Sequence, residues 1–153
     1  DKWAVHVGGG LTHRIDRSDA PMIKENDFAN PAFSLIEQMS DAALNRDFLV
    51  IEVISMEHAL SVANLWKNDI QNNQSASRLT LLLDNLGPEH SRDVALRLET
   101  DGLRNVLVLE GSGGVVMDEL DRWAQSSMDV VSSGALTMDA TPIDMTMLME
   151  AIR

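Results

Sequence analysis

The chain of 153 residues contains no cysteine, which excludes disulfides and thiolate chemistry and is compatible with the cytoplasm, where we expect the protein to reside. It has no apolar run near the roughly 18 residues of a membrane span, and no charged-then-apolar leader. Basic residues are few, because 12 Lys plus Arg stand against 24 Asp plus Glu, a formal net charge of -12. A surface this acidic repels phosphate backbones and anionic lipids, so we expect neither nucleic acid nor a membrane as a partner.

The hydrophobic share of 44% is enough for one compact core, so we treat residues 1–153 as a single domain. Short apolar runs alternate with helix-like stretches, and several runs are continuous, as in strands covered on both faces. The expected strands are WAVHV at 3–7, PMIK at 21–24, FLVIEV at 48–53, LTLLLD at 79–84, VLVLEG at 106–111 and DVVSSG at 129–134. This alternation predicts an α/β fold with a parallel sheet or barrel.

Helices are expected between these strands, where apolar residues recur at helical spacing. Their apolar faces are Ala32, Leu35, Ile36, Met39 and Ala43; Met56, Ala59, Leu60, Ala63 and Trp66; and Met117, Leu120 and Trp123–Ala124. Pro88 and Pro142 are placed as first residues of helices. The polar stretch 67–78 (KNDIQNNQSASR) is interpreted as a surface loop or an insertion.

Polar residues end the expected strands, and in a parallel barrel the carboxyl ends of all strands meet at one face, where active sites are built. Glu52 and Asp84 end two successive strands. Such carboxylates ligate Mg²⁺, bind sugar hydroxyls or stabilise positive charge developing on a sugar ring. The alternative for each carboxylate alone is a solvated cap of the next helix.

Small residues follow the next two strand ends, at Ser112-Gly113-Gly114 and at Ser132-Ser133-Gly134. Turns of this kind expose backbone N–H groups that suit a phosphate, although each alone could equally be an ordinary tight turn. Near the start of the chain, three glycines precede His13 and Arg14, and Lys24 closes an apolar run. These cations are candidates for binding an anionic ligand; the alternative for His13 and Arg14 is a plain surface loop.

In this order the motifs resemble the quinolinate phosphoribosyltransferase family. The matching segments are WAVHVGGGLTHR, SDAPMIKEN, IEVISMEH, LLLDN, LEGSGG and MDVVSSGALT, followed by Asp144. They span essentially the whole chain and are specific as an ordered set. The resemblance implies the later part of an α/β barrel, as a partial or open barrel that lacks the family's N-terminal domain and first barrel segment.

The resemblance also implies a reaction, in which phosphoribosyl pyrophosphate and quinolinate, with Mg²⁺, give nicotinate mononucleotide, pyrophosphate and CO₂. Lys24, Glu52 and Asp84 look like the catalytic residues, and Glu52 and Asp84 like the groups that face the ribose and the metal. His13, Arg14 and Lys24 look like the cations around the carboxylates of quinolinate. Two sets of residues look like the 5′-phosphate cradle: Ser112, Gly113 and Gly114, and Ser133, Gly134 and Ala135.

Some features depart from the family pattern. Asp27 stands where the family usually has a His after Lys-[Asp/Glu]-Asn, and an acid there would weaken a dicarboxylate pocket unless a partner such as Arg17 paired with it. Without the family's front section the chain alone is expected to be a poor catalyst, acting as a homodimer or larger assembly, or with a complementing chain. A paralogue for another aromatic acid and a non-catalytic phosphate-binding subunit remain as alternatives.

Overall fold

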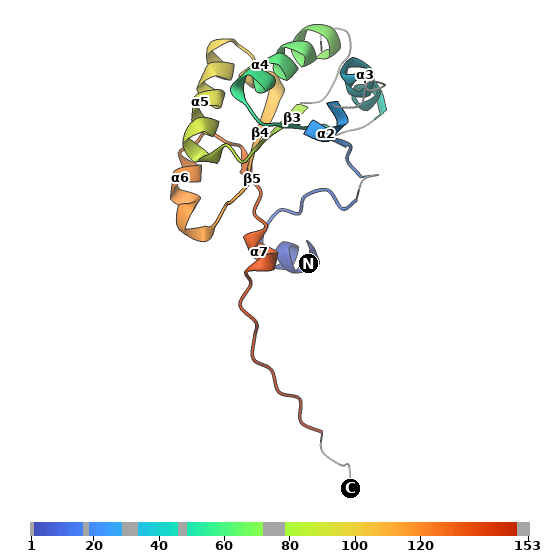
Figure 1. Ribbon diagram of the computed structural model, residues 1–153. Helices are drawn as coiled ribbons and strands as arrows, with labels where there is room; N and C mark the ends of the chain where they lie inside the picture. The colour runs from blue at the N-terminus through green and yellow to red at the C-terminus, as the bar shows by residue number, and fades with distance from the viewer. Residues whose placement is uncertain (1, 17–18, 29–33, 46–48, 72–78, 150–153) are drawn as a thin grey trace.

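The protein is described here from a computed structural model that places residues 2–16, 19–28, 34–45, 49–71 and 79–149. Its centre is one parallel sheet in which each strand pairs with the next along the chain, in the order β1-β2-β3-β4-β5 (Figure 1). The strands are β1 (Met22–Ile23), β2 (Leu49–Val53), β3 (Leu79–Asp84), β4 (Leu107–Ser112) and β5 (Val130–Val131). The expected parallel α/β fold is therefore confirmed, as an open sheet with β1 and β5 at its edges.

Helices connect the strands. They are α1 (Lys2–Val7), α2 (Glu25–Phe28), α3 (Leu35–Asn45), α4 (Met56–Leu65), α5 (Gly87–Thr100), α6 (Leu120–Ala124) and α7 (Ala135–Met138), with a π-helix at Trp66–Gln71 and 3₁₀ turns at Arg104–Val106 and Met117–Glu119. Helix α4 begins where the Ser55 side chain accepts a hydrogen bond from the backbone N–H of His58, and Pro88 lies in the first turn of α5. Within the described residues, none of these helices has the length and apolar character needed to cross a membrane.

The two faces of the sheet differ in chemistry because side chains alternate along each strand. One face packs against α3, α4 and α5 and forms the core, through Leu49, Ile51, Val53, Leu79, Leu81, Leu83, Leu107 and Leu109. The residues between them, including Glu52, Asp84, Glu110 and Ser112, belong to the opposite face. Strand register aligns Glu52 with Leu82 and Leu82 with Glu110 in one row, and Asp84 with Ser112 two residues further on. The opposite face therefore gathers acidic and hydroxyl groups near the carboxyl ends of the strands.

Two expected elements are wrong. The segment WAVHV forms helix α1 rather than a strand, and its Trp3 is 76% exposed. Within the described residues no strand lies beside it, so its backbone bonds locally, and it ends at Gly8–Gly10, where Gly9 has a φ of 88°. The helix expected from Pro142 is absent, because residues 140–149 run as an extended chain. A short helix needs a surface against which to bury its apolar face, and the side chains of 140–149 are all exposed to solvent in the described structure.

Part of the segment expected to be a loop, 67–78, is helical, since the π-helix continues to Gln71. Lys67 anchors it, because its ammonium donates to the carbonyl of Gly102 at 2.9 Å. Residues 72–78 lie outside the described residues, and so does Ala32, the first residue of the helix face expected at 32–43. The surface loop or insertion stays a prediction for that remainder.

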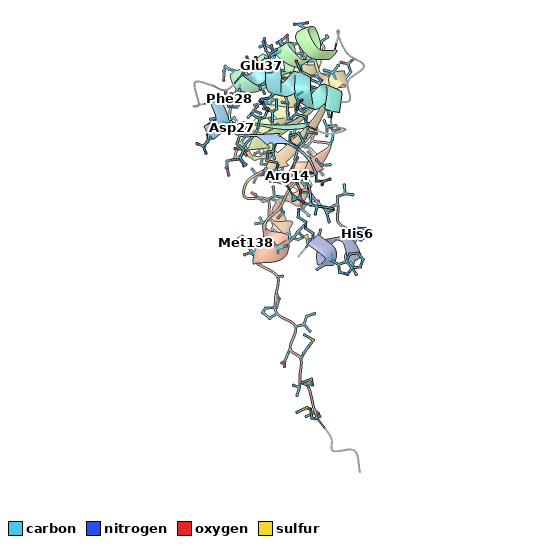
Figure 2. All side chains as sticks on the ribbon, turned by 90° about the vertical axis from the view of Figure 1, so that its right-hand side faces the viewer. His6, Arg14, Asp27, Phe28, Glu37 and Met138 are labelled. Atoms are coloured by element: carbon cyan, nitrogen blue, oxygen red, sulfur yellow. The ribbon has the colours of Figure 1, made fainter. Side chains whose placement is uncertain are left out.

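Exposed apolar side chains gather at one end of the molecule, where α1 and α7 lie side by side and the tail extends away from the sheet (Figures 1 and 2). We call this surface the apolar end. Its members are Trp3, Val7, Leu136, Met138, Ile143, Met145, Met147, Leu148 and Met149. Each of them is more than half exposed, Leu136 least at 56%. The described structure therefore leaves these side chains uncovered, both where α1 meets α7 and along the tail that extends away from them (Figures 1 and 2).

Candidate active site

Lys24 and Glu52 form the first part of the site. Register pairs Ile23 of β1 with Ile51 of β2, so Lys24, which follows β1, lies next to Glu52. The Lys24 ammonium is 2.5 Å from Glu52 Oε2, with 51% of the lysine side chain exposed but only 9% of the glutamate side chain. The Lys24 side chain is therefore accessible to a ligand, whereas the Glu52 carboxylate beneath it is buried.

Asp27 stabilises the turn that carries Lys24. Its carboxylate accepts a hydrogen bond of 2.8 Å from the backbone N–H of Lys24. The expected pairing of Asp27 with Arg17 cannot be followed, because Arg17 lies outside the described residues. The observed contact gives the Asp27 carboxylate a local backbone partner.

His13 and Arg14 lie on the loop before β1 and are both held by protein groups. The backbone N–H of Arg14 donates to His13 Nδ1 at 2.9 Å, and His13 Nε2 lies 3.3 Å from Glu110 Oε1. The Arg14 guanidinium donates to the carbonyl of Ala20 at 2.8 Å, and Figure 2 shows Arg14 between the sheet and the α1–α7 end. The loop is therefore tied to both β1 and β4.

Asp84 and the glycine turn after β4 are packed against each other. Asn85 donates from its side chain to Asp84 Oδ2 at 2.7 Å and from its backbone to the carbonyl of Ser112 at 3.0 Å. A Cβ on Gly113 would lie 2.2 Å from Asn85 Oδ1, and Gly113 has a φ of 88°. Only glycine fits at this position, which brings its backbone close to Asn85, the residue after Asp84.

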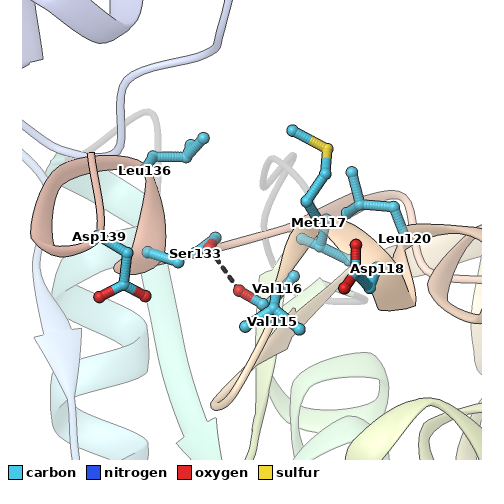
Figure 3. Close-up of a pocket in the computed structure, with 10 residues that line it drawn as sticks. Val115, Val116, Met117, Asp118, Leu120, Ser133, Leu136 and Asp139 are labelled. Atoms are coloured by element: carbon cyan, nitrogen blue, oxygen red, sulfur yellow. Dashed lines mark hydrogen bonds between the residues drawn. The ribbon is translucent and has the colours of Figure 1, made fainter. Parts of the chain in front are cut away.

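A hydrogen bond connects the second small-residue turn, Ser133-Gly134-Ala135, to the segment that follows β4. Ser133 Oγ donates to the carbonyl of Val115 at 2.5 Å (Figure 3). A cavity of about 450 Å³ opens beside it, with mostly apolar walls and the two carboxylates Asp118 and Asp139. Apolar walls and negative charge do not suit a phosphate, so the cavity is not the phosphate site, and the backbone of the two turns is the better candidate.

The chain was compared with known families and proteins. The family described as "Quinolinate phosphoribosyl transferase, C-terminal domain" matches residues 1–148. The chain belongs to this family.

The relatives of this chain are longer than the chain itself. A "Probable nicotinate-nucleotide pyrophosphorylase (carboxylating)" of Methanothermobacter thermautotrophicus is 31% identical over 153 residues, which is 100% of this chain and 52% of that protein. The "Nicotinate-nucleotide pyrophosphorylase (carboxylating)" of Rattus norvegicus is 30% identical over 99% of this chain and 47% of its own length. The crystal structure of NadC from Streptococcus pyogenes superposes with a TM-score of 0.71 at 28% identity, covering 94% of this chain and 45% of that one. The chain thus spans about half the length of the curated relatives it matches.

Glu110 was not selected as a site residue from the sequence, although the structure brings it next to His13. It is only 2% exposed and contacts both His13 and Ser132. One signal was available: Glu110 precedes Ser112 by two residues, and side chains two apart on a strand share a face. The partners could not be read from the sequence, because His13 lies on a distant loop.

A divalent metal has two candidate ligands among the described residues, Glu52 and Asp84. They extend from neighbouring strands on the same face, and Asp84 lies two residues beyond Leu82, the register partner of Glu52. In the part of the chain that the structure describes, no group of three or more acidic or His side chains could hold a metal by itself. Two carboxylates nevertheless fit Mg²⁺, because this ion is commonly bound by one or two carboxylates together with waters and substrate phosphates.

Proposed function

We propose that this chain carries the site for phosphoribosyl transfer from phosphoribosyl pyrophosphate to quinolinate with decarboxylation, giving nicotinate mononucleotide. The family and the printed names of the relatives support the proposal. Within the structure, the observation that carries it is the Lys24–Glu52 pair beside Asp84 and the Gly113 turn. This face combines a cation for a carboxylate substrate, acidic groups for a ribose, and a glycine turn with positive φ whose backbone could approach a phosphate.

The candidate site residues have different roles according to their charge. Lys24 and Arg14 attract the carboxylates of quinolinate, and His13, which directly precedes Arg14 on the same loop, is proposed as a further part of that binding site. Glu52 and Asp84 face the ribose, where negative charge stabilises the oxocarbenium character that develops as pyrophosphate leaves. When CO₂ leaves, the electron pair of the broken C–C bond stays on the pyridine ring, where nearby cations stabilise the negative charge, and a proton from solvent then takes the place of the lost carboxyl group.

The two small-residue turns would hold the 5′-phosphate, through backbone N–H groups of Ser112, Gly113 and Gly114 and of Ser133, Gly134 and Ala135. Mg²⁺, when bound at Glu52 and Asp84, would neutralise charge on the pyrophosphate. We propose it as the cofactor on the strength of the two carboxylates and the family.

The apolar end is the place where we propose that this domain meets further protein, either in a homodimer or in a unit that supplies the part of the relatives outside the match. A surface with many exposed large apolar side chains marks protein–protein contacts. A cytoplasmic location is part of the same proposal. The alternative of another aromatic acid as substrate rested on Asp27, and the backbone contact of that side chain gives it no support.

The test measures pyrophosphate release from phosphoribosyl pyrophosphate and Mg²⁺ with quinolinate, using the chain alone and with any polypeptide that copurifies. Calorimetry with each substrate separately measures binding. We expect both substrates to bind, and turnover to be slow for the chain alone and faster with the partner. Binding of phosphoribosyl pyrophosphate without turnover in either condition would contradict the proposal and favour a non-catalytic phosphate-binding subunit. Turnover only with another aromatic acid would point to a paralogue.

A further inference from the structure

A buried carboxylate joins two parts of the site that lie far apart in the sequence. Glu110 of β4 is 2% exposed, and its Oε1 is 3.3 Å from His13 Nε2. The same oxygen accepts a hydrogen bond from the hydroxyl of Ser132, which directly follows β5. A carboxylate this buried has a large desolvation cost unless it is paired, and both partners belong to loops at the carboxyl end of the sheet.

The contacts of His13 determine which of its nitrogens carries the proton. The backbone N–H of Arg14 donates to Nδ1 at 2.9 Å, so Nδ1 must offer its lone pair. The proton of the neutral ring is then on Nε2, which is directed at the Glu110 carboxylate. The backbone of Arg14 on one side and Glu110 on the other thereby hold both the tautomer and the ring orientation.

A nucleophilic serine is not what this arrangement provides. Ser132 Oγ bonds to the carboxylate and not to the imidazole, and His13 uses Nε2 on the same carboxylate oxygen. No lone pair of the imidazole is left to take the proton of the hydroxyl, as a general base must. The three groups therefore connect two loops and do not form a catalytic triad. We call Glu110 with its contacts to His13 and Ser132 the Glu110 brace.

We propose that Glu110 is a positioning residue, which keeps His13 in the Nε2-protonated tautomer and links the His13–Arg14 loop to the turn that begins at Ser132. The effect on substrate rests on the proposed function: the brace holds the cationic loop that would meet quinolinate at a set distance from the turn that would hold the 5′-phosphate. Glu110 itself touches neither substrate. Its contribution is made through the two loops.

The first test follows the His13 ring in proton–nitrogen correlation spectra at about pH 8, where an unperturbed imidazole is neutral. The wild-type chain should show His13 as the Nε2–H tautomer. Glu110→Met, which keeps the length of the side chain but removes the acceptor, should give a mixture of tautomers. Glu110→Gln should restore the wild-type pattern, because its carbonyl oxygen still accepts from Nε2. Glu99→Gln, at an exposed position of α5, is the charge-matched control and should change nothing.

The proposal is overturned if wild-type His13 carries its proton on Nδ1, or if Glu110→Met leaves the His13 spectrum unchanged. Failure of Glu110→Met to fold does not remove the test, because the wild-type tautomer decides the assignment by itself.

The second test measures quinolinate affinity by calorimetry. Glu110→Met should weaken it about tenfold, in the range usual for groups that orient a ligand-contacting side chain, whereas Glu99→Gln should leave it within about twofold. Unchanged affinity in Glu110→Met, with altered His13 tautomers, would overturn the link to the substrate. If the wild-type chain binds neither quinolinate nor phosphoribosyl pyrophosphate, the proposed function fails, while the spectra still decide the role of Glu110.

Discussion

Removing a half-buried carboxylate at the site should affect ligand binding more than the free energy of unfolding. Asp84 is half-buried at the end of β3 and has an amide partner in Asn85. We expect Asp84→Ala to change the free energy of unfolding by less than about 1 kcal/mol, the range of a single partly exposed hydrogen bond. Binding of phosphoribosyl pyrophosphate with Mg²⁺ should fall at least about tenfold, since one of the two proposed ligands is lost. Urea unfolding and calorimetry give the two quantities.

The matched control for Asp84 is Asp93→Ala, on the exposed side of α5, which should leave both quantities unchanged. Glu52→Ala should likewise leave most of the stability intact, because its partner Lys24 is half exposed and water can solvate the freed ammonium. A large loss of stability in Asp84→Ala with unchanged binding would assign that residue to capping the next helix.

Two adjacent glycines allow backbone strain to be separated from a steric clash. Gly113 and Gly114 both have positive φ, at 88° and 64°, but a Cβ would meet Asn85 at 2.2 Å only at Gly113, and nothing within 4 Å at Gly114. Gly114→Ala should therefore cost about 1 kcal/mol of unfolding free energy from φ alone. Gly113→Ala should cost more and should also displace Asn85 and weaken phosphate binding. Equal losses in the two variants would show that the clash at Asn85 relaxes freely.

His58 should make stability depend on pH. Its pKa is lowered because the ring is partly buried, where it packs edge-on against Phe28 with ring centroids 5.0 Å apart. The unfolded chain therefore binds the proton more readily than the folded one. The stability contributed by His58 is fully present above its unfolded pKa of about 6.5 and is lost as the pH falls towards the lower folded pKa.

Urea unfolding from about pH 7.5 to pH 5 tests this, by comparing wild type with His58→Gln across the unfolded pKa. The wild-type chain should lose more stability over this range than the variant. Identical slopes would contradict the assignment, and His90→Gln, at an exposed position of α5, provides the control for loss of a histidine.

At the scale of elements, the three central strands form the rigid part of the sheet. Strands β2, β3 and β4 have five or six residues each and form the core with α3, α4 and α5, whereas β1 and β5 have two residues each. Glu52, Asp84 and Glu110 are on the long strands, while Lys24 and Ser132 follow the short ones. The carboxylates therefore belong to the long core strands, and their partners Lys24 and Ser132 follow the short edge strands, to which the ion pair and the Glu110 contacts connect them.

Helix α4 offers a direct test of a single capping interaction. Ser55 Oγ accepts the backbone N–H of His58 at 3.1 Å, which satisfies one of the free donors of the first turn. Ser55→Ala should lower the unfolding free energy by about 1 kcal/mol. Ser61→Ala changes the same residue type at an exposed interior position of α4 and should be neutral or slightly stabilising. Denaturant midpoints at constant slope are the measurement.

At the scale of the whole molecule, the apolar end exposes more large apolar side chains than is usual for a monomeric protein. The alternating residues Ile143, Met145, Met147 and Met149 are each at least 79% exposed on an extended segment. We expect the isolated chain to self-associate, with a weight-average mass that rises with concentration in sedimentation equilibrium, because burying these side chains removes apolar surface from water.

Charged substitutions test whether self-association depends on the apolar end or on exposed apolar side chains anywhere on the surface. Met145→Asp with Met147→Asp should shift association to at least about tenfold higher concentration, which corresponds to about 1.4 kcal/mol. Leu96→Asp with Ile54→Asp makes the same change at two half-exposed positions away from that end and should leave association as in wild type. Equal effects of the two pairs would show that added negative charge, and not the apolar end, controls assembly.

The sequence by itself determined the central sheet and the face on which its carboxylates lie. Strands β2, β3 and β4 are continuous apolar runs, and side chains alternate between faces, so Glu52 and Asp84 could be placed at strand ends without any contact being known. The start of α5 at Gly87–Pro88 was equally readable. These features are local, because they depend on backbone geometry and on the side chains of one segment.

The tertiary structure decided what depends on distant neighbours. The apolar run at 3–7 was expected to be a strand, but the segment is part of helix α1, where its backbone hydrogen bonds are local. Lys24 meets Glu52 across 28 positions, and Ser132 meets Glu110 across 22. No local pattern specifies such pairs, because strand register and loop placement are set by packing of the whole core. The helix expected from Pro142 is likewise missing, because residues 140–149 are exposed and pack against no other part of the described structure.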